Sequence, residues 1–580
     1  MPCISNTASS DFADFITRYY TSPEEYIRTV GTDCIDFISN QFAVLHLPLS
    51  SVQELTFNTY TYASVPELYS LLDVTTMEAA GISQTSETPS LSNRGRGVLI
   101  GFIDTGIDYQ NPLFQNPDGT SRILGIWDQT IDSEKEDLER NPSEMGSSIP
   151  ETTFRPTYGT QYTKSQIDLA LTSDNPLSIV PSTDTSGHGT ALASIAAGGA
   201  DEASGFLGAA PESYICVVKL KPAKPYLRDF FLIQEDAEAF QENDIMLGIT
   251  YLFSLAQQYK TPLVVCLGLG TNSGSHTGQS TLAQFINEMS RYNGTAFVVA
   301  AGNETGYDHH YRGTTTAMNT SDRIELKVGA ETPGFSLEFW AQDIGVYSIG
   351  FLSPSGQFVP GAPARTDRPE TYDFLLENTQ ITVYSRVTTT ESASQMIFLR
   401  FQTPQPGIWT MIITSLTDLP GTFHLWLPTR TFIPDSIGFL RSDPDTIVTG
   451  PGNALHPITV SAYDHTRNSI YIHSSRGYSR SGQIKPDLAA PGVNVLAAGR
   501  RPGMYIRLTG TSAAAAHVAG AAAILLSWGI LDGNEPYMNS DTIKTYLIRG
   551  ADRNPSLPYP NREFGYGTLN LYQAFLRLRL

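Results

Sequence analysis

Residues 508–526 read LTGTSAAAAHVAGAAAILL, a sequence that predicts a strand-like approach followed by a buried helix. Its alanine-rich part is broken only by His517, Val518 and Gly520, a composition typical of a buried helix of small side chains. Ser512 begins that helix, where unpaired backbone N–H groups and the helix dipole favour negative charge. Two interpretations follow: a simple N-cap serine, or a nucleophile whose alkoxide and oxyanion this end of the helix would stabilise.

Length and charge limit the number of units and the kinds of partner that the chain can have. A chain of 580 residues is too long for one ordinary core, and its length predicts three to four units. With 37 Lys+Arg against 58 Asp+Glu the net charge is −21, which argues against nucleic acid or an anionic membrane as partner. The first twenty residues lack a signal-peptide pattern and we expect no membrane span, so the sequence predicts cytoplasmic synthesis.

The cysteines predict neither a metal site nor redox chemistry. Cys3, Cys34, Cys216 and Cys266 show no CxxC spacing, and we expect buried free thiols and no cofactor. Calcium stays open: an acidic run such as SEKEDLE (133–139) offers carboxylate ligands, although exposed charge is the commoner meaning of such a run.

Residues 1–90 predict a small α/β domain. FADFITRYYTSPEEYIRTVG (12–31) and SVPELYSLLD (64–73) have helical periodicity, whereas FAVLHLPL (42–49) alternates like a strand. The polar stretch 81–97 that follows, rich in Ser, Thr, Gly and Asn, predicts an exposed boundary that is easily cut.

Residues 91–310 predict an α/β fold with a doubly wound parallel sheet. Apolar runs that look like buried strands alternate with helical stretches. The runs are GVLIGFID (97–104), SYICVVKL (213–220), PLVVCLGLG (262–270) and TAFVVAAGN (295–303), and the helical stretches are 244–259 and 280–292.

Residues 311–440 predict a β insertion, because short alternating runs separated by Pro, Gly and Asp turns replace the helices, as in a sandwich or jelly roll. Residues 441–580 return to α/β texture, and Ser540 is the expected N-cap of a helix over 540–551.

Two residues upstream could activate Ser512. His188, in DTSGHGTALASIAAG, lies between glycines at the start of a predicted helix and is the candidate base. Asp104, in FIDTGID, ends the first core strand and could orient the imidazole. Each alone has an ordinary explanation as a turn former or a helix cap. Their chain order of Asp, His, Ser is the subtilisin order.

Five motifs together resemble those of the subtilisin-like serine peptidases: FIDTGID, SGHGTALASIAAG, FVVAAGN, KPDLAAPG and GTSAAAAHVAG. The resemblance implies Asp104, His188 and Ser512 as the triad and Asn303 as the oxyanion asparagine. It also implies substrate binding at Gly268, Leu269 and Gly270, where an extended peptide would pair as an added strand. The family's usual Ser-Leu-Gly is Gly-Leu-Gly here, so the pocket preference does not carry over.

The order of the predicted domains points to a subgroup of this family. Residues 1–90 have the size and position of a subtilisin propeptide, which in the family is cut autocatalytically; the alternative is a permanent small domain. The segments 97–131 and 158–171, together with the β insertion between Asn303 and Ser512, make the chain similar to the Csp germination proteases of spore-forming clostridia. That likeness implies a jelly-roll insertion, a propeptide that can stay bound, a spore-associated location, and the precursor of a spore cortex-lytic enzyme as substrate.

Two other functions are alternatives to an endopeptidase. A catalytically silent, pseudoprotease-like regulator that binds a protein or a germination signal would be expected to lack a triad residue, and none is missing. An esterase of the α/β-hydrolase kind fails on its motif, because 510–514 lacks the second glycine of the nucleophile elbow and the triad order differs.

Overall fold

The computed structural model describes residues 12–19, 21–31, 35–37, 42–51, 75–88, 91, 93–131, 158–342, 344–362, 369–387 and 394–578. By its internal contacts the chain divides into two compact units, 1–71 and 72–580. The predicted helix 64–73, Cys3, Cys34 and the acidic run 133–139 lie outside the described residues.

The first unit is a small α/β structure. Its elements are β1 (Phe12–Arg18), α1 (Pro23–Val30), β2 (Ile35–Phe37) and β3 (Phe42–Pro48). β1 and β2 each pair antiparallel with β3, which gives a three-stranded sheet. The strand expected at 42–49 is confirmed, but the helix expected from residue 12 is wrong over 12–18. Pairing with β3 overrides the local periodicity there, and the helix begins only after Ser22, its N-cap.

In the second unit, α2 (Thr75–Ala79) and α3 (Ile82–Glu87) come first, and the chain at Ala80 pairs with the far C-terminus. The Leu571 N–H donates to the Ala80 carbonyl oxygen at 2.9 Å. The two compact units divide after residue 71, and the expected domain boundaries at 90, 310 and 440 remain predictions.

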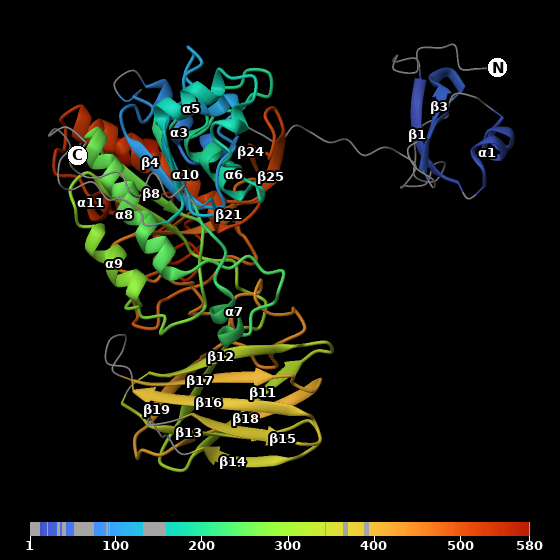
Figure 1. The fold of residues 1–580 in the computed structure, drawn as a ribbon, viewed down its shortest axis with the longest axis vertical. Coiled ribbons are helices and arrows are strands. Elements are labelled where there is room, and N and C mark those ends of the chain that lie inside the picture. The colour runs from blue at the N-terminus through green and yellow to red at the C-terminus, as the bar shows by residue number, and fades with distance from the viewer. Residues whose placement is uncertain are drawn as a thin grey trace. The chain divides into compact units, whose positions relative to one another are not determined.

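A mostly parallel sheet forms the centre of the helix-containing part of the second unit (Figure 1). Its strand order is β22-β21-β9-β8-β4-β7-β5-β6, with β23 beside β21. The strands are β4 (Leu99–Asp104), β5 (Ile123–Asp128), β6 (Thr160–Thr163), β7 (Tyr214–Lys219), β8 (Leu263–Leu267), β9 (Thr295–Ala300), β21 (Ile458–Asp464), β22 (Ser469–Ile470) and β23 (Leu488–Pro491). β6 and β22 pair antiparallel at the two edges, and the remaining pairs are parallel, as the sequence predicts.

Helices cover both faces of this sheet, and each face has its own apolar core. α6 and α10 pack on one face, while α8 and α9 pack on the other. The helices of this part are α5 (Lys164–Leu171), α6 (His188–Ala197), α7 (Pro225–Phe231), α8 (Glu242–Tyr259), α9 (Thr281–Met289), α10 (Thr511–Leu526), α11 (Ser540–Gly550) and α12 (Leu571–Arg577), and a hairpin joins β24 (Val495–Ala498) to β25 (Tyr505–Leu508). Short 3₁₀ turns lie at Leu49–Ser51, Pro112–Phe114 and Pro176–Ser178, and a π turn follows α10 at Ser527–Leu531.

Helix α10 is buried along its whole length. Together with the π turn it makes a 21-residue helix, Thr511–Leu531, apolar enough to cross a membrane by length and composition. The sequence predicts no membrane span, although this run has the length and composition of one. Since 83% of its most apolar window is buried inside the protein, the run serves here as a core helix.

The insertion consists of two antiparallel sheets that enclose a core of their own. One sheet has the order β10-β19-β12-β17-β16-β15 and the other β14-β13-β18-β11-β20. The strands are β10 (His310–Thr315), β11 (Ser321–Val328), β12 (Gly334–Ala341), β13 (Tyr347–Leu352), β14 (Phe358–Ala362), β15 (Glu370–Phe374), β16 (Thr379–Val387), β17 (Gln395–Gln402), β18 (Gly407–Ser415), β19 (Gly421–Trp426) and β20 (Gly438–Phe439). The expected β insertion is confirmed.

Stacked aromatic rings join the insertion to the central domain. Trp426, at the end of β19, stacks on His276 with ring centroids 4.1 Å apart. His310 and His424 stack against the same indole at 5.0 and 5.1 Å. The Gly274 N–H also donates to Glu338 on β12 at 2.9 Å. The loop that follows residues 268–270 is therefore held by the insertion.

Two smaller predictions have mixed outcomes. Asn539, rather than Ser540, caps α11, because its side chain accepts from the Thr542 N–H. Cys216 and Cys266 are free and buried, as expected.

Candidate active site

Asp104 and His188, 84 residues apart in the sequence, are in contact. Asp104 is the last residue of β4 and only 1% exposed, and His188 is the first residue of α6. The His188 Nδ1 lies 2.8 and 3.0 Å from the two carboxylate oxygens. Because an ionised carboxylate only accepts, Nδ1 carries the proton and Nε2 is left as a base.

A second buried carboxylate, Asp184, organises the loop that carries His188. Its Oδ1 accepts from the Thr105 hydroxyl at 2.9 Å and from the Gly187 N–H at 2.7 Å. Its Oδ2 accepts from the N–H and the hydroxyl of Thr190 at 2.9 and 2.7 Å. Asp184 thus ties the start of α6 to the residue that follows Asp104, and it fixes the backbone on both sides of His188.

The charges around His188 make its ring more basic. Burial lowers the pKa of His188, but the opposing attraction of Asp104, its hydrogen bond to the ring, and weaker contributions from Asp184 and Glu238 outweigh it. The net effect is a pKa above the ordinary value of 6.5. The imidazolium that forms when a proton is taken up is therefore stabilised.

Ser512 is the second residue of α10, which confirms its expected place at a helix N-terminus. Its Oγ donates to the Gly268 carbonyl oxygen at 3.1 Å. A Cβ built on Gly268 would lie 3.1 Å from His188 Cε1 and 3.3 Å from Ser512 Cβ. The imidazole and the serine therefore face the same glycine.

Asn303 lies beside Ser512, in the loop after β9. Its Oδ1 accepts from the Thr511 N–H at 3.0 Å, and the Thr511 hydroxyl accepts from the Gly302 N–H at 3.1 Å. With its oxygen fixed in this way, Asn303 has Nδ2 left to donate. Gly510, at φ +151°, leaves room for this amide, since a Cβ there would lie 3.1 Å from Nδ2.

Residues 268–270 follow β8 and are partly exposed. A Cβ on Gly268 would lie 2.7 Å from Leu192 Cδ2, so Leu192 fills the space that a serine would occupy. A Cβ on Gly270 would overlap the Thr449 hydroxyl. Substrate binding along Gly268, Leu269 and Gly270 remains a prediction.

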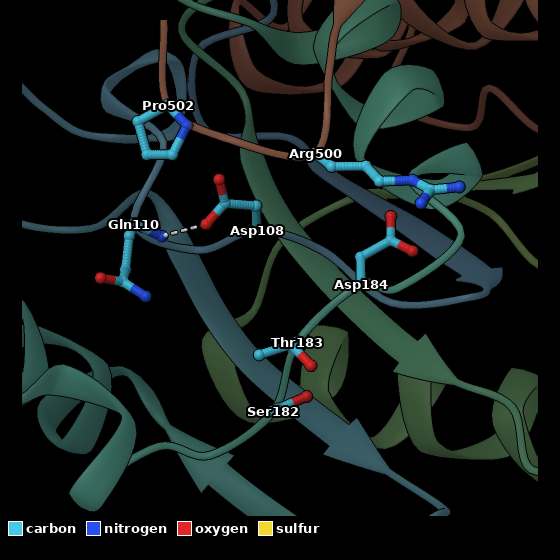
Figure 2. Close-up of a pocket in the computed structure, with 7 residues that line it drawn as sticks. All are labelled: Asp108, Gln110, Ser182, Thr183, Asp184, Arg500 and Pro502. Atoms are coloured by element: carbon cyan, nitrogen blue, oxygen red, sulfur yellow. Dashed lines mark hydrogen bonds between the residues drawn. The ribbon is translucent and has the colours of Figure 1, made fainter. Parts of the chain in front are cut away.

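A small cavity of about 170 Å³ lies next to the His188 loop, lined by Asp108, Gln110, Ser182, Thr183, Asp184, Arg500 and Pro502 (Figure 2). Burial raises the pKa of Asp108 to about 6. The Arg500 Nε donates to the Ser186 carbonyl oxygen at 2.9 Å, so the β24–β25 hairpin covers this side of the loop. Among the described residues, no group of three or more His, Cys, Asp or Glu side chains could hold a metal ion.

Asp184 and Thr511 are not predicted as site residues from the sequence. A signal existed for Asp184, because a carboxylate four residues before His188 and just ahead of a helix can accept from the free N–H groups there. Thr511 lies within the quoted Gly-Thr-Ser motif, but its contacts with the Asn303 loop depend on tertiary approach.

Comparison with known proteins defines the class. Residues 95–396 and 441–567, well over half of the chain, match the subtilase family, peptidase S8. The chain therefore belongs to the subtilase family of serine proteases, and all five motifs fall inside the matched residues.

Among solved structures, the CspB protease of Clostridium perfringens is similar to this chain. The TM-score is 0.75 at 30% identity, over 87% of this chain and 99% of that one. Pyrolysin of Pyrococcus furiosus is 34% identical over 123 residues, and serine protease AprX of Bacillus subtilis is 31% identical over 134 residues. Each match covers 20% of this chain, but only 8% of pyrolysin and 29% of AprX.

Proposed function

We propose that the protein is a serine endopeptidase that hydrolyses peptide bonds through an acyl-enzyme. One observation carries the proposal: a buried carboxylate contacts an imidazole that faces, across Gly268, a serine at a helix N-terminus beside an amide donor. Subtilase membership supports the same reaction.

The reaction begins with proton transfer from the Ser512 Oγ to the His188 Nε2 while Oγ bonds to the substrate carbonyl carbon. The carbonyl oxygen becomes an oxyanion that accepts from the Ser512 N–H and the Asn303 Nδ2. When the C–N bond breaks, His188 returns the proton to the leaving amine. Water then repeats the sequence on the acyl-enzyme and releases the acid. Asp104 holds the ring and stabilises its cationic form.

The resting hydroxyl must turn before attack, since Ser512 Oγ donates to Gly268. Rotation about the Cα–Cβ bond breaks that hydrogen bond and lets Oγ donate to His188 instead. Hydrogen bonds between catalytic groups commonly shorten only when substrate binds. The resting geometry is compatible with a low reactivity until the cleft is filled.

We further propose that the enzyme cuts its own chain between residues 70 and 95 and that its protein substrate is the precursor of a spore cortex-lytic enzyme. Likeness to the CspB protease along nearly that whole chain supports this substrate class. A separate small unit ahead of the catalytic part supports a propeptide.

Intact mass and N-terminal sequencing of purified wild type and Ser512→Ala test the proposal together with a casein-cleavage assay. We expect the wild type to be cut once near the start of the catalytic part and to digest casein, and the alanine variant to do neither. A fully processed alanine variant would contradict self-cleavage. A wild type that digests nothing and forms no serine adduct would favour the silent, pseudoprotease-like regulator.

A further inference from the structure

A buried carboxylate, Glu304, directly follows the oxyanion candidate Asn303. It is 4% exposed. Three donors converge on its Oε2, each at 3.2 Å: the Asn272 Nδ2, the His309 Nδ1 and the Arg430 N–H. A carboxylate that is removed from water and met by three donors is held firmly in place.

The three donors come from different parts of the fold. Asn272 lies two residues after the predicted substrate-binding segment 268–270. His309 immediately precedes β10, where the chain enters the jelly roll, and Arg430 lies in the segment that leaves β19. Glu304 therefore joins the substrate-binding side of the cleft to both ends of the insertion.

The backbone around Asn303 is fixed on both sides. The Ser475 N–H donates to the Gly302 carbonyl oxygen at 2.9 Å, and the Glu304 N–H donates to the Ser475 hydroxyl at 3.1 Å. Asn303 stands between these two anchors, with its own oxygen held by Thr511. Displacing Glu304 would thus move the amide that faces the oxyanion.

We propose that Glu304 is a positioning residue. It fixes the orientation of the Asn303 amide, and it makes the oxyanion site depend on the attachment of the jelly roll. The inference rests on the proposed peptidase function. Since an error of about 1 Å in placement can cost roughly a hundredfold in rate, loss of this carboxylate should lower kcat more than it raises KM.

A double-mutant cycle tests this most sharply. We expect Glu304→Gln to lower kcat about tenfold or more in the wild-type background. In the Asn303→Ala background the same change should alter kcat less than about twofold, because the amide it positions is gone. Glu377→Gln is the matched control: Glu377 is also a buried carboxylate (3% exposed), and it accepts from Ser355 within the jelly roll. It should leave kcat unchanged.

A second pair of variants covers the case in which Glu304→Gln fails to fold. His309→Leu removes one donor and should lower kcat, whereas His309→Asn restores an N–H near the position of Nδ1 and should recover most of it. Equal losses of kcat for the two His309 variants would overturn the inference.

The outcomes of the double-mutant cycle distinguish failure of the positioning role from failure of the peptidase function. Equal effects of Glu304→Gln in both backgrounds, or an effect on KM confined to substrates with basic side chains, would overturn the positioning role while leaving the peptidase intact. A wild type without Ser512-dependent turnover would remove the proposed function and this inference with it.

Discussion

Asn303 is the most informative residue to substitute, because the oxygen and the nitrogen of its side-chain amide are assigned different roles. The oxygen accepts from the Thr511 N–H at 3.0 Å, and the nitrogen is the donor assigned to the oxyanion. Asn303→Ala removes both roles, whereas Asn303→Asp keeps an oxygen for Thr511 and removes only the donor. The pair separates catalysis from stability.

The expected magnitudes follow from these contacts. Loss of one oxyanion donor costs about 10²–10³ in kcat, roughly 2.7–4 kcal/mol, so both variants should lose at least this much while KM changes little. Thr511 is 1% exposed, so its orphaned N–H in the alanine variant should cost about 1–3 kcal/mol of stability. The aspartate variant should lose none, since a carboxylate suits a helix N-terminus.

Two assays check this prediction. Steady-state kinetics on one peptide substrate give kcat and KM, and urea unfolding in the Ser512→Ala background gives stability without self-digestion. An Asn303→Ala enzyme within about threefold of the wild-type kcat would refute the assignment of the oxyanion donor. An aspartate variant as unstable as the alanine variant would refute the role of the oxygen.

Three further predictions follow. Asp184→Asn replaces one of two accepting oxygens with a donor, in a site that already holds four donors. It should lower kcat by about tenfold to a hundredfold and stability by about 1–3 kcal/mol. Unchanged kinetics would contradict the role of Asp184 in positioning His188. The acid limb of kcat/KM should lie above pH 6.5, because the pKa of His188 is raised and only the neutral ring is a base; a pH–rate profile with its limb below 6.5 would contradict this. Burial lowers the pKa of His276 to about 3, that of His310 to about 4 and that of His424 well below 6.5, so below pH 6.5 the unfolded chain binds protons that the folded chain does not bind. Stability should therefore be complete above pH 6.5 and should fall toward pH 4 by up to about 1.4 kcal/mol per pH unit for each histidine. Urea unfolding that shows no such dependence on pH would refute the buried neutral histidine stack.

The sequence predicts the parallel sheet, and it predicts correctly that Asp104 lies at the end of a strand and Ser512 at the start of a helix. Asp104 ends a continuous apolar run, and Ser512 begins an alanine-rich helix, so the position of each follows from a local pattern. Contact between Asp104 and His188 could be expected only from the order of the motifs, since the two are 84 residues apart.

Roles that depend on tertiary approach could not be predicted. Glu304 looks like an ordinary loop residue until Asn272, His309 and Arg430 converge on it from distant segments. The strand at 12–18 could not be predicted for the same reason, because pairing with β3 determines its structure and its own periodicity does not.

Labelling with a fluorophosphonate probe, read out by intact and peptide mass, is the most direct test that Ser512 is the activated nucleophile. We expect one adduct per processed wild-type chain, located on Ser512, with none on Ser512→Ala and slow labelling of His188→Ala. An unlabelled wild-type protein, or an adduct that persists in Ser512→Ala, would contradict it.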